Sequence, residues 1–254
     1  MRLLSFQNLV SPRVAHGVST RHGGVSEGVY GQLNLSASVG DEPERVAENR
    51  GRLAEALGFA RDQLVTTPQE HGKHVMVVDQ NNVDQALETR ADAIITRTPG
   101  ILLMQRFADC VPLLYWEPAA NIVGVAHAGW RGTRLGVASA TVAAITALGG
   151  SSAQVQVAIG PSIGPCCFEV GSDVAGEFAA TPSSVSVGPA GRPHVDLWGA
   201  NQQYLVAAGV PLANIEVARV CTRCNQDDYF SHRVLGYPAG RFGAAIGIRT
   251  GVDA

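Results

Sequence analysis

The stretch from Ile101 to Gly132, ILLMQRFADCVPLLYWEPAANIVGVAHAGWRG, decides the fold. It contains three short apolar runs, Ile101–Gln105, Pro112–Trp116 and Ile122–Ala126, and it ends in a glycine-rich turn. Short apolar runs that are bounded by turn residues are typical of buried β-strands. The stretch therefore predicts three consecutive strands at the centre of a sheet structure.

The segments on either side add more strands and several helices. We expect strands at Val14–Val18, Leu64–Thr67, Val75–Val78, Ala93–Thr96, Val155–Ile159, Ile215–Val220 and Ala244–Ile248, and helices at Pro43–Phe59, Leu135–Leu148, Ser172–Ala180 and Leu197–Ala208. Asp41 is a suitable N-cap for the first helix. Strands and helices mix without a strict βαβ rhythm, and no Pro- or Ser-rich linker divides them. We therefore predict one layered α/β domain over residues 1–254, with mixed β-sheets and helices.

Composition narrows the class of protein. Hydrophobic residues make up 46% of the chain, charged residues only 16%, and the net charge is −3, so a sizeable core is expected and nucleic-acid binding is not. Met1–Pro12 is too broken for a signal peptide, and no apolar run approaches the roughly 20 residues that span a bilayer. The five cysteines favour reduced thiols in a cytoplasmic protein without membrane contacts. The oligomeric state is left open.

One thiol and two imidazoles stand at the ends of strand-like segments. Cys110 follows Ile101–Gln105, His127 ends the run that begins at Ile122, and His71 precedes Val75–Val78. Three N/S ligands with an open fourth position are the arrangement of a catalytic zinc. Copper would also bind such a set. Each residue alone has a plainer interpretation, as a buried thiol or a hydrogen-bonded imidazole.

Asp109 lies directly before Cys110. Neighbouring residues of a strand point to opposite faces, so both can meet one site only if the chain turns there, and Pro112 favours such a turn. The alternative is that Asp109 caps a neighbouring turn.

Two glycine-rich turns carry arginines. Arg131 lies in His127–Gly132 before a predicted helix, and Arg21 lies in Thr20–Ser26. A cation beside free backbone N–H groups suits phosphate or another anion. Ordinary surface turns are the alternative, because complete phosphate-loop motifs are absent.

Two further patterns concern metals. Cys221–Cys224 is a Cys-x-x-Cys motif, and Cys166–Cys167 could contribute to a closed zinc site. The adjacent pair lacks the usual two-residue gap, so buried thiols are favoured over a four-cysteine site. The chain has seven histidines and no His-x-His pair, which disfavours a multicopper centre.

Taken together, these motifs resemble the laccase-domain family, also described as polyphenol-oxidase-like proteins, peptidoglycan editing factors and purine nucleoside phosphorylases. The matching segments follow the family's order along nearly the whole chain: Thr20–Gly24, Asn34–Ser36, Asn49–Arg50, Gln69–Gly72, Ala91–Ala93, Ala108–Cys110, His127–Gly132, Gly160–Ile163, Phe168–Gly171, Cys221–Thr222, Phe230–Arg233 and Gly240–Arg241. Ser231–Val234 departs from it, since His232 replaces an aromatic residue and the second arginine is missing.

The resemblance implies an α/β/β/α-type sandwich and a metal triad of His71, Cys110 and His127. It also implies a zinc-dependent purine nucleoside phosphorylase, acting on adenosine, inosine, guanosine and methylthioadenosine, with adenosine deaminase activity. Its small-molecule partners would be purine nucleosides and phosphate. Arg21, Arg131 or Arg233 would hold the phosphate, and Asp109 is the candidate acid for deamination.

Three alternatives remain open at this point. In a cysteine-dependent amidase or hydrolase that edits peptidoglycan precursors, Cys110 would be the nucleophile, His127 its base and His71 the orienting group. A copper-dependent polyphenol oxidase (laccase) would use the same three residues as ligands. A catalytically idle binding protein would hold nucleotides or a partner.

Overall fold

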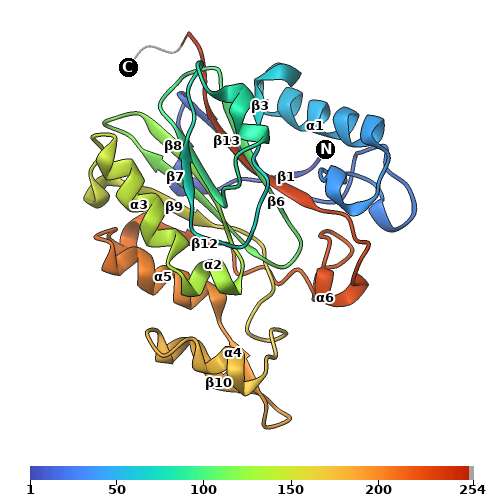
Figure 1. Ribbon diagram of the computed structural model, residues 1–254, viewed down its shortest axis with the longest axis vertical. Coiled ribbons are helices and arrows are strands. Elements are labelled where there is room, and N and C mark those ends of the chain that lie inside the picture. The colour runs from blue at the N-terminus through green and yellow to red at the C-terminus, as the bar shows by residue number, and fades with distance from the viewer. Residues whose placement is uncertain (252–254) are drawn as a thin grey trace.

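Two mixed β-sheets form the centre of the computed structural model, which describes residues 1–251 (Figure 1). The first sheet runs in the order β1 (Leu3–Leu4), β2 (Val14–Ser19), β13 (Phe242–Ile248), β6 (Leu102–Phe107), β3 (Leu64–Val65). The second runs β12 (Ile215–Val217), β9 (Gln156–Ile159), β7 (Val111–Glu117), β8 (Ile122–Ala128), β5 (Ala93–Thr96), β4 (Val75–Val77). The three consecutive strands predicted around Ile101–Gly132 are thus β6, β7 and β8. The chain changes sheet between the first two of them.

Helices cover the outer faces of both sheets. Helix α1 (Pro43–Ala56) packs on the first sheet, and α3 (Val137–Ala147) and α5 (Leu197–Ala207) pack on the second, beside the short α2 (Trp130–Arg134). The short α4 (Ser172–Gly176) and the hairpin of β10 (Val185–Val187) and β11 (Pro193–Val195) extend from the lower end of the body in Figure 1, and α6 (His232–Leu235) lies beside the first sheet. The expected α/β/β/α sandwich is therefore confirmed.

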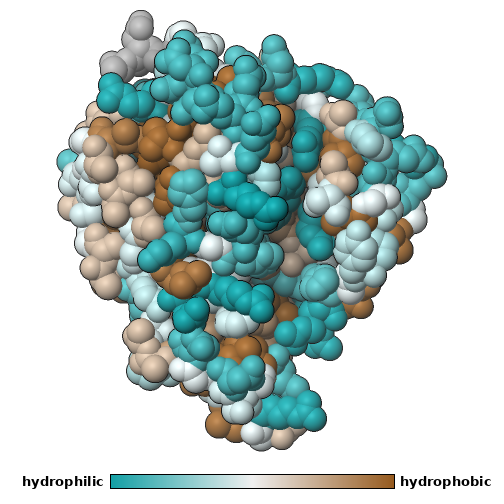
Figure 2. Space-filling model, viewed as in Figure 1, coloured by the Kyte–Doolittle hydropathy of each residue, from teal (hydrophilic) through white to brown (hydrophobic). Residues whose placement is uncertain are grey.

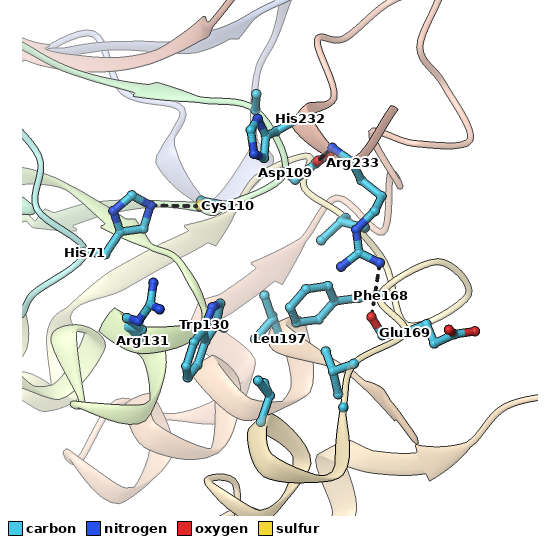
Figure 3. Close-up of a pocket in the computed structure, with 15 residues that line it drawn as sticks. His71, Asp109, Cys110, Trp130, Arg131, Phe168, Glu169, Leu197, His232 and Arg233 are labelled. Atoms are coloured by element: carbon cyan, nitrogen blue, oxygen red, sulfur yellow. Dashed lines mark hydrogen bonds between the residues drawn. The ribbon is translucent and has the colours of Figure 1, made fainter. Parts of the chain in front are cut away.

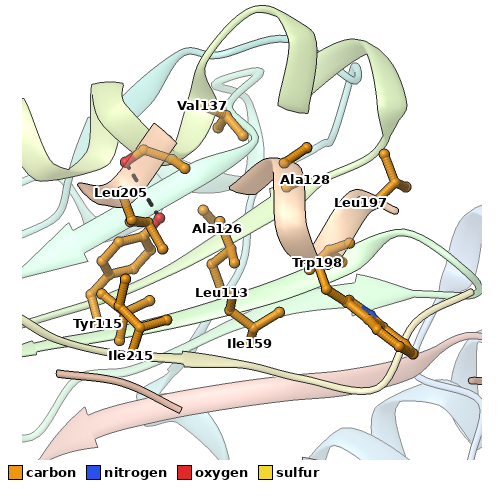
Figure 4. Packing of buried hydrophobic residues seen from close by; sticks show 14 of the residues in the cluster. Leu113, Tyr115, Ala126, Ala128, Val137, Ile159, Leu197, Trp198, Leu205 and Ile215 are labelled. Atoms are coloured by element: carbon orange, nitrogen blue, oxygen red, sulfur yellow. Dashed lines mark hydrogen bonds between the residues drawn. The ribbon is translucent and has the colours of Figure 1, made fainter. Parts of the chain in front are cut away.

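Strand alternation creates two distinct layers of core on either side of the second sheet. In β7, Leu113 and Tyr115 face α3 and α5, whereas Leu114 and Trp116 face the first sheet. The helix-facing layer is drawn in Figure 4. Full burial of such a side chain contributes about 1.5–3 kcal/mol. Because both faces of β7 are buried, its sequence reads as a continuous apolar run.

Helix α1 begins differently from the prediction. Its N-cap is Glu42, not Asp41, and no side chain caps the helix. Asp41 instead accepts hydrogen bonds from Ser26 Oγ at 2.6 Å and Asn34 Nδ2 at 2.9 Å. The Asp41 carboxylate therefore connects the neighbouring loops and does not cap the helix.

The site depends on two places where the chain crosses from the first sheet to the second. One crossing joins β3 to β4 through residues 66–74, and the other joins β6 to β7 through residues 108–110. Residues on these crossings lie at the edge of the layer between the sheets. Groups that are far apart in sequence can therefore meet there.

Polar residues cover most of the face shown in Figure 2, and apolar residues form small patches among them. Among the described residues, no helix has the length and apolar character needed to cross a bilayer.

Candidate metal centre

The structure brings the predicted triad together. His71 lies on the first crossing, Cys110 on the second, and His127 near the end of β8. Their ligand atoms all lie within 4.8 Å of one another, and Cys110 Sγ is 3.9 Å from His71 Nε2 (Figure 3). Ideal tetrahedral zinc with Zn–S and Zn–N bonds of about 2.3 and 2.0 Å places S and N about 3.5 Å apart. The observed S–N separation fits a metal after a shift of a few tenths of an ångström.

Asp92, which directly precedes β5, organises two of the three ligands. Its Oδ1 accepts from His127 Nδ1 at 2.8 Å and from the backbone N–H of His71 at 3.0 Å, and its Oδ2 accepts from the N–H of Gly72 at 2.7 Å. With Nδ1 engaged, Nε2 of His127 is left for the metal. Burial opposes the ionisation of Asp92, but the hydrogen bonds from His127 and the backbone hold its pKa below the usual range. A carboxylate, imidazole and metal in this order are a recurrent way to fix a ligating histidine.

Two site residues have left-handed backbone conformations. The φ angle is 63° at His71 and 80° at Asp109, neither of which is glycine. Such conformations cost about 1–3 kcal/mol and persist only where the surroundings enforce them. The turn at Asp109 lets both Asp109 and Cys110 line one cavity, as the sequence expectation required.

The Asp109 carboxylate is fully engaged. Oδ1 accepts from Thr222 Oγ1 at 2.6 Å, and Oδ2 accepts from Ser231 Oγ at 3.1 Å and from the Arg233 N–H at 2.6 Å. These bonds fasten the chain around Cys110 to the C-terminal segment. They favour a positioning role for Asp109 over proton transfer.

Glycine at position 129 lets the backbone approach the ligands closely. A Cβ there would lie 2.9 Å from His71 Cδ2 and 3.1 Å from Cys110 Sγ. Any side chain would therefore push one or both ligands out of place. The turn between β8 and α2 therefore leaves room for the side chains of His71 and Cys110, because Gly129 has no side chain.

The thiol and the imidazole beside it shift each other's ionisation. Burial opposes ionisation of Cys110, but His127 outweighs it and lowers the pKa of the thiol to about 6. Burial also opposes protonation of His127, yet Cys110 and Asp92 raise its pKa to about 9. The pair therefore favours a thiolate next to an imidazolium, and a thiolate is the form that binds metals and attacks electrophiles.

His71 and Cys110 border two cavities, and His127 borders the second of them. The first, of about 510 Å³, contains Trp130, Phe168 and Leu197 in its wall, and we name it the aromatic cavity. Figure 3 shows these three side chains close together below Cys110. Flat apolar walls suit the face of an aromatic ring system.

The second cavity, of about 650 Å³, contains three arginines, and we name it the arginine cavity. They are Arg50, Arg106 and Arg241. Burial and the charges of the other two lower the pKa of Arg106 to about 10, and burial lowers that of Arg50 and Arg241. Within residues 1–251, none of the three has a carboxylate at ion-pair distance. Three half-buried cations without a counter-ion are groups that suit an anion.

One residue in the wall of the arginine cavity has a buried hydroxyl without a hydrogen-bond partner among the described residues. This residue is Thr66, which is 3% exposed, and the hydroxyl oxygen is its Oγ1. A buried hydroxyl without a partner costs free energy unless a ligand or water completes it.

The arginines that the sequence suggested lie elsewhere. Arg131 and Arg233 line the aromatic cavity, and the Arg131 guanidinium lies 4.5 Å from the centroid of the Trp130 ring. Arg21 lines neither cavity. It donates to the carbonyls of Gly31 and Gln226 and therefore ties two loops together.

Sequence reasoning gave no role to Asp92, Arg50, Arg106 or Arg241. Three of them stand in motifs that carried the family resemblance, Asn49–Arg50, Ala91–Ala93 and Gly240–Arg241. Arg106 had no such signal, because its neighbours in sequence are those of a strand.

The remaining cysteines also differ from the prediction. Cys166 and Cys224 are exposed, so these two are not the expected buried thiols. Cys167 and Cys221 are buried, and the four sulfurs lie within 4.8 Å of one another.

Fold and site together define a class, the layered α/β proteins with a His/Cys/His site at the boundary between two sheets. Within that class, the chain belongs to the family described as multi-copper polyphenol oxidoreductase laccase, whose model matches residues 15–249. The resemblance found in the sequence is thereby confirmed.

Relatives carry two enzyme names. Purine nucleoside phosphorylase YlmD of Geobacillus stearothermophilus is 40% identical and covers 92% of this chain and 89% of its own length. Adenosine deaminase RL5, from an unknown prokaryotic organism, is 41% identical over 88% of this chain and 90% of its own length. The crystal structure of YlmD has a TM-score of 0.88 and 38% identity, covering 94% of this chain and 93% of that one.

Proposed function

We propose that the protein is a zinc-dependent purine nucleoside phosphorylase that also deaminates adenosine. One observation carries the proposal: His71 and Cys110 border both the aromatic cavity and the arginine cavity. A nucleoside has a flat base and a polar sugar, and phosphorolysis adds a phosphate dianion. The names of the relatives agree with this assignment.

The donor set fits zinc. One thiolate and two imidazoles leave a fourth position open, and soft sulfur with nitrogen suits zinc well. Bound there, zinc would supply Lewis-acid chemistry and an activated water.

In phosphorolysis, the chain's own residues would mainly bind and orient. Trp130 and Phe168 would hold the base, and Arg50, Arg106 and Arg241 would hold the phosphate. A phosphate oxygen then forms a bond to C1′ while the bond from C1′ to the base nitrogen breaks. The electron pair leaves with the base, which takes up a proton, and ribose 1-phosphate remains. In deamination, water replaces the amino group at C6, and ammonia leaves.

The decisive experiment measures both reactions on purified protein with known zinc content. We expect inosine cleavage to require phosphate and adenosine deamination to proceed without it. Cys110→Ala should abolish both. Zinc-loaded protein that releases neither free base nor ammonia from a panel of purine nucleosides would refute the proposal.

The lowered pKa of Cys110 favours a second candidate, the cysteine-dependent hydrolase. A thiolate next to an imidazolium is the resting state of many cysteine nucleophiles. Zinc would occupy the thiolate. Stoichiometric zinc at this site would therefore argue against a cysteine nucleophile, whereas rapid alkylation of Cys110 in freshly purified protein without zinc there would favour the hydrolase.

Copper-dependent phenol oxidation is the activity that the family description suggests. Within residues 1–251, the metal-ligating group that contains histidine has two imidazoles and one thiol, fewer than a multicopper cluster uses. We therefore expect phenol oxidation to be weak and to depend on added copper.

A further inference from the structure

Four cysteines outside the proposed catalytic site come together from two distant segments. Cys166 and Cys167 lie in a turn after β9, and Cys221 and Cys224 lie in a turn after β12. All four Sγ atoms lie within 4.8 Å of one another, with Cys224 Sγ 3.4 Å from Cys167 Sγ and 3.8 Å from Cys166 Sγ. A tetrahedral zinc with four Zn–S bonds of about 2.3 Å has its sulfurs about 3.8 Å apart. We propose that these four cysteines bind a second zinc ion, which serves a structural role.

Local backbone structure explains how an adjacent pair can supply two ligands. The N–H groups of both Cys167 and Phe168 donate to the carbonyl of Gly164 at 2.9 Å, so the chain turns tightly through Cys166 and Cys167. In such a turn, neighbouring side chains do not alternate between opposite faces as they do on a strand. The missing two-residue gap, which argued against the site in the sequence, is therefore no obstacle.

The other pair also has its side chains on one side. The N–H of Asn225 donates to the carbonyl of Cys221 at 3.0 Å, which makes one helical turn. Residues three apart on a helical turn lie side by side. Cys221 and Cys224 can therefore reach the same ion.

The surroundings suit sulfur that carries negative charge. The N–H of Gly164 donates to Cys221 Sγ at 3.2 Å, and Arg223 Nη1 donates to Cys167 Sγ at 3.5 Å. A Cβ at Gly164 would lie 2.7 Å from Trp198 Cη2 and 3.2 Å from Cys221 Cβ, so glycine lets the backbone approach both residues. An N–H group and a guanidinium both compensate the charge of thiolates around a divalent ion.

The position of the cluster indicates what the zinc would do. After Cys167, the first segment continues into Phe168 and Glu169 in the wall of the aromatic cavity. In the second segment, Thr222 donates to Asp109, and the chain continues to Arg233 in the same wall. A closed four-sulfur site would lock these two segments together and thus fix one side of the cavity.

Zinc analysis of single-cysteine variants tests the proposal. Wild-type protein purified from zinc-containing medium should hold about two zinc ions per chain, and Cys224→Ser should hold about one. Cys110→Ser is the matched control, because Cys110 is the one cysteine outside the cluster, and it should also retain about one. Cobalt loaded into Cys110→Ser should give the absorption of tetrahedral thiolate coordination.

The outcomes separate this inference from the proposed function. Zinc that is unchanged in Cys224→Ser and absent from Cys110→Ser would overturn the second site and leave the first intact. Zinc that is lost only from Cys224→Ser would instead overturn the catalytic zinc.

A measurement on wild-type protein covers the case in which the variants do not fold. We expect the four cluster thiols to resist alkylation until a chelator removes the metal, as read by intact mass. Rapid alkylation of all four without a chelator would contradict the site. So would a non-reduced mass that shows a disulfide among them in freshly purified protein.

Discussion

Asp92 is the residue on which two of the three proposed ligands depend. It holds the His127 ring by Nδ1 and the His71 loop by backbone N–H groups. We predict that Asp92→Asn weakens zinc affinity about 10- to 100-fold, the usual cost of losing a partner of a metal-bound histidine. Competition with a chelator measures it, and Asp84→Asn, at an exposed aspartate, is the control. Equal affinity in both variants would show that Asp92 does not position the ligands.

A side chain added at Gly129 tests whether the triad tolerates an extra atom beside its ligands. We predict that Gly129→Ala displaces His71 or Cys110, because the added Cβ would lie 2.9 and 3.1 Å from their side-chain atoms. Bound zinc at this site should fall well below one equivalent. Gly176→Ala is the matched control, since a Cβ there meets nothing within 4 Å. Full zinc occupancy in Gly129→Ala would mean that the ligands can move without losing the metal.

At the scale of elements, the two crossings between sheets create the site. β6 belongs to the first sheet and β7 to the second, and Cys110 stands between them. Arg106 near the end of β6 therefore faces the arginine cavity while Cys110 borders both cavities. Arg106 and Cys110, which are four positions apart in the sequence, thus provide a cation in the arginine cavity and a proposed metal ligand beside it.

The arginine cavity gives an element-scale prediction about phosphate. We predict that Arg241→Gln lowers kcat/KM for phosphate about 10- to 100-fold, because a charge-assisted hydrogen bond contributes roughly 1.5–3 kcal/mol. Arg131→Gln, which alters the aromatic cavity, should affect the nucleoside KM more than the phosphate KM. Adenosine deamination, which uses no phosphate, should change little in Arg241→Gln.

Exposed Arg97→Gln is the control for loss of a cation, and thermal melts confirm folding. If kcat/KM for phosphate fell in Arg131→Gln and not in Arg241→Gln, phosphate would bind in the aromatic cavity and not in the arginine cavity.

At the scale of the whole molecule, His16 couples folding to pH. Its Nε2 accepts the Phe6 N–H at 2.9 Å, and burial lowers its pKa from 6.5. Between the folded pKa and 6.5, the unfolded chain therefore binds more protons than the folded one. The stability from His16 is thus complete above pH 6.5 and falls as the pH drops below that value.

We predict that the Tm of the wild type, measured with excess zinc, declines more steeply between pH 7 and pH 5 than that of His16→Gln. Glutamine keeps an acceptor for Phe6 but does not titrate. Each kcal/mol moves the Tm of a chain of this size by about 2–4 °C, so the difference is measurable. His74→Gln, at an exposed histidine, should follow the wild type. Parallel curves for wild type and His16→Gln would remove His16 from the pH response.

The sequence by itself predicted most of the longer strands and helices and picked out the three residues of the triad. Buried strands such as β7 and β8 read as apolar runs because local side-chain pattern sets secondary structure. His71, Cys110 and His127 could be picked out because each stands where such a run meets a turn. The family resemblance then supplied the layered sandwich, which periodicity alone did not give.

Only the tertiary structure decided which of these groups meet. Asp92 holds two of the proposed ligands, three arginines share one cavity, and Asp109 accepts hydrogen bonds from the C-terminal segment. All of these are contacts between segments that lie far apart in the chain. Cys167 and Cys224 are 57 positions apart, yet their sulfurs touch. Local pattern carries no record of such contacts, because the packing of two sheets and their crossings brings distant segments together.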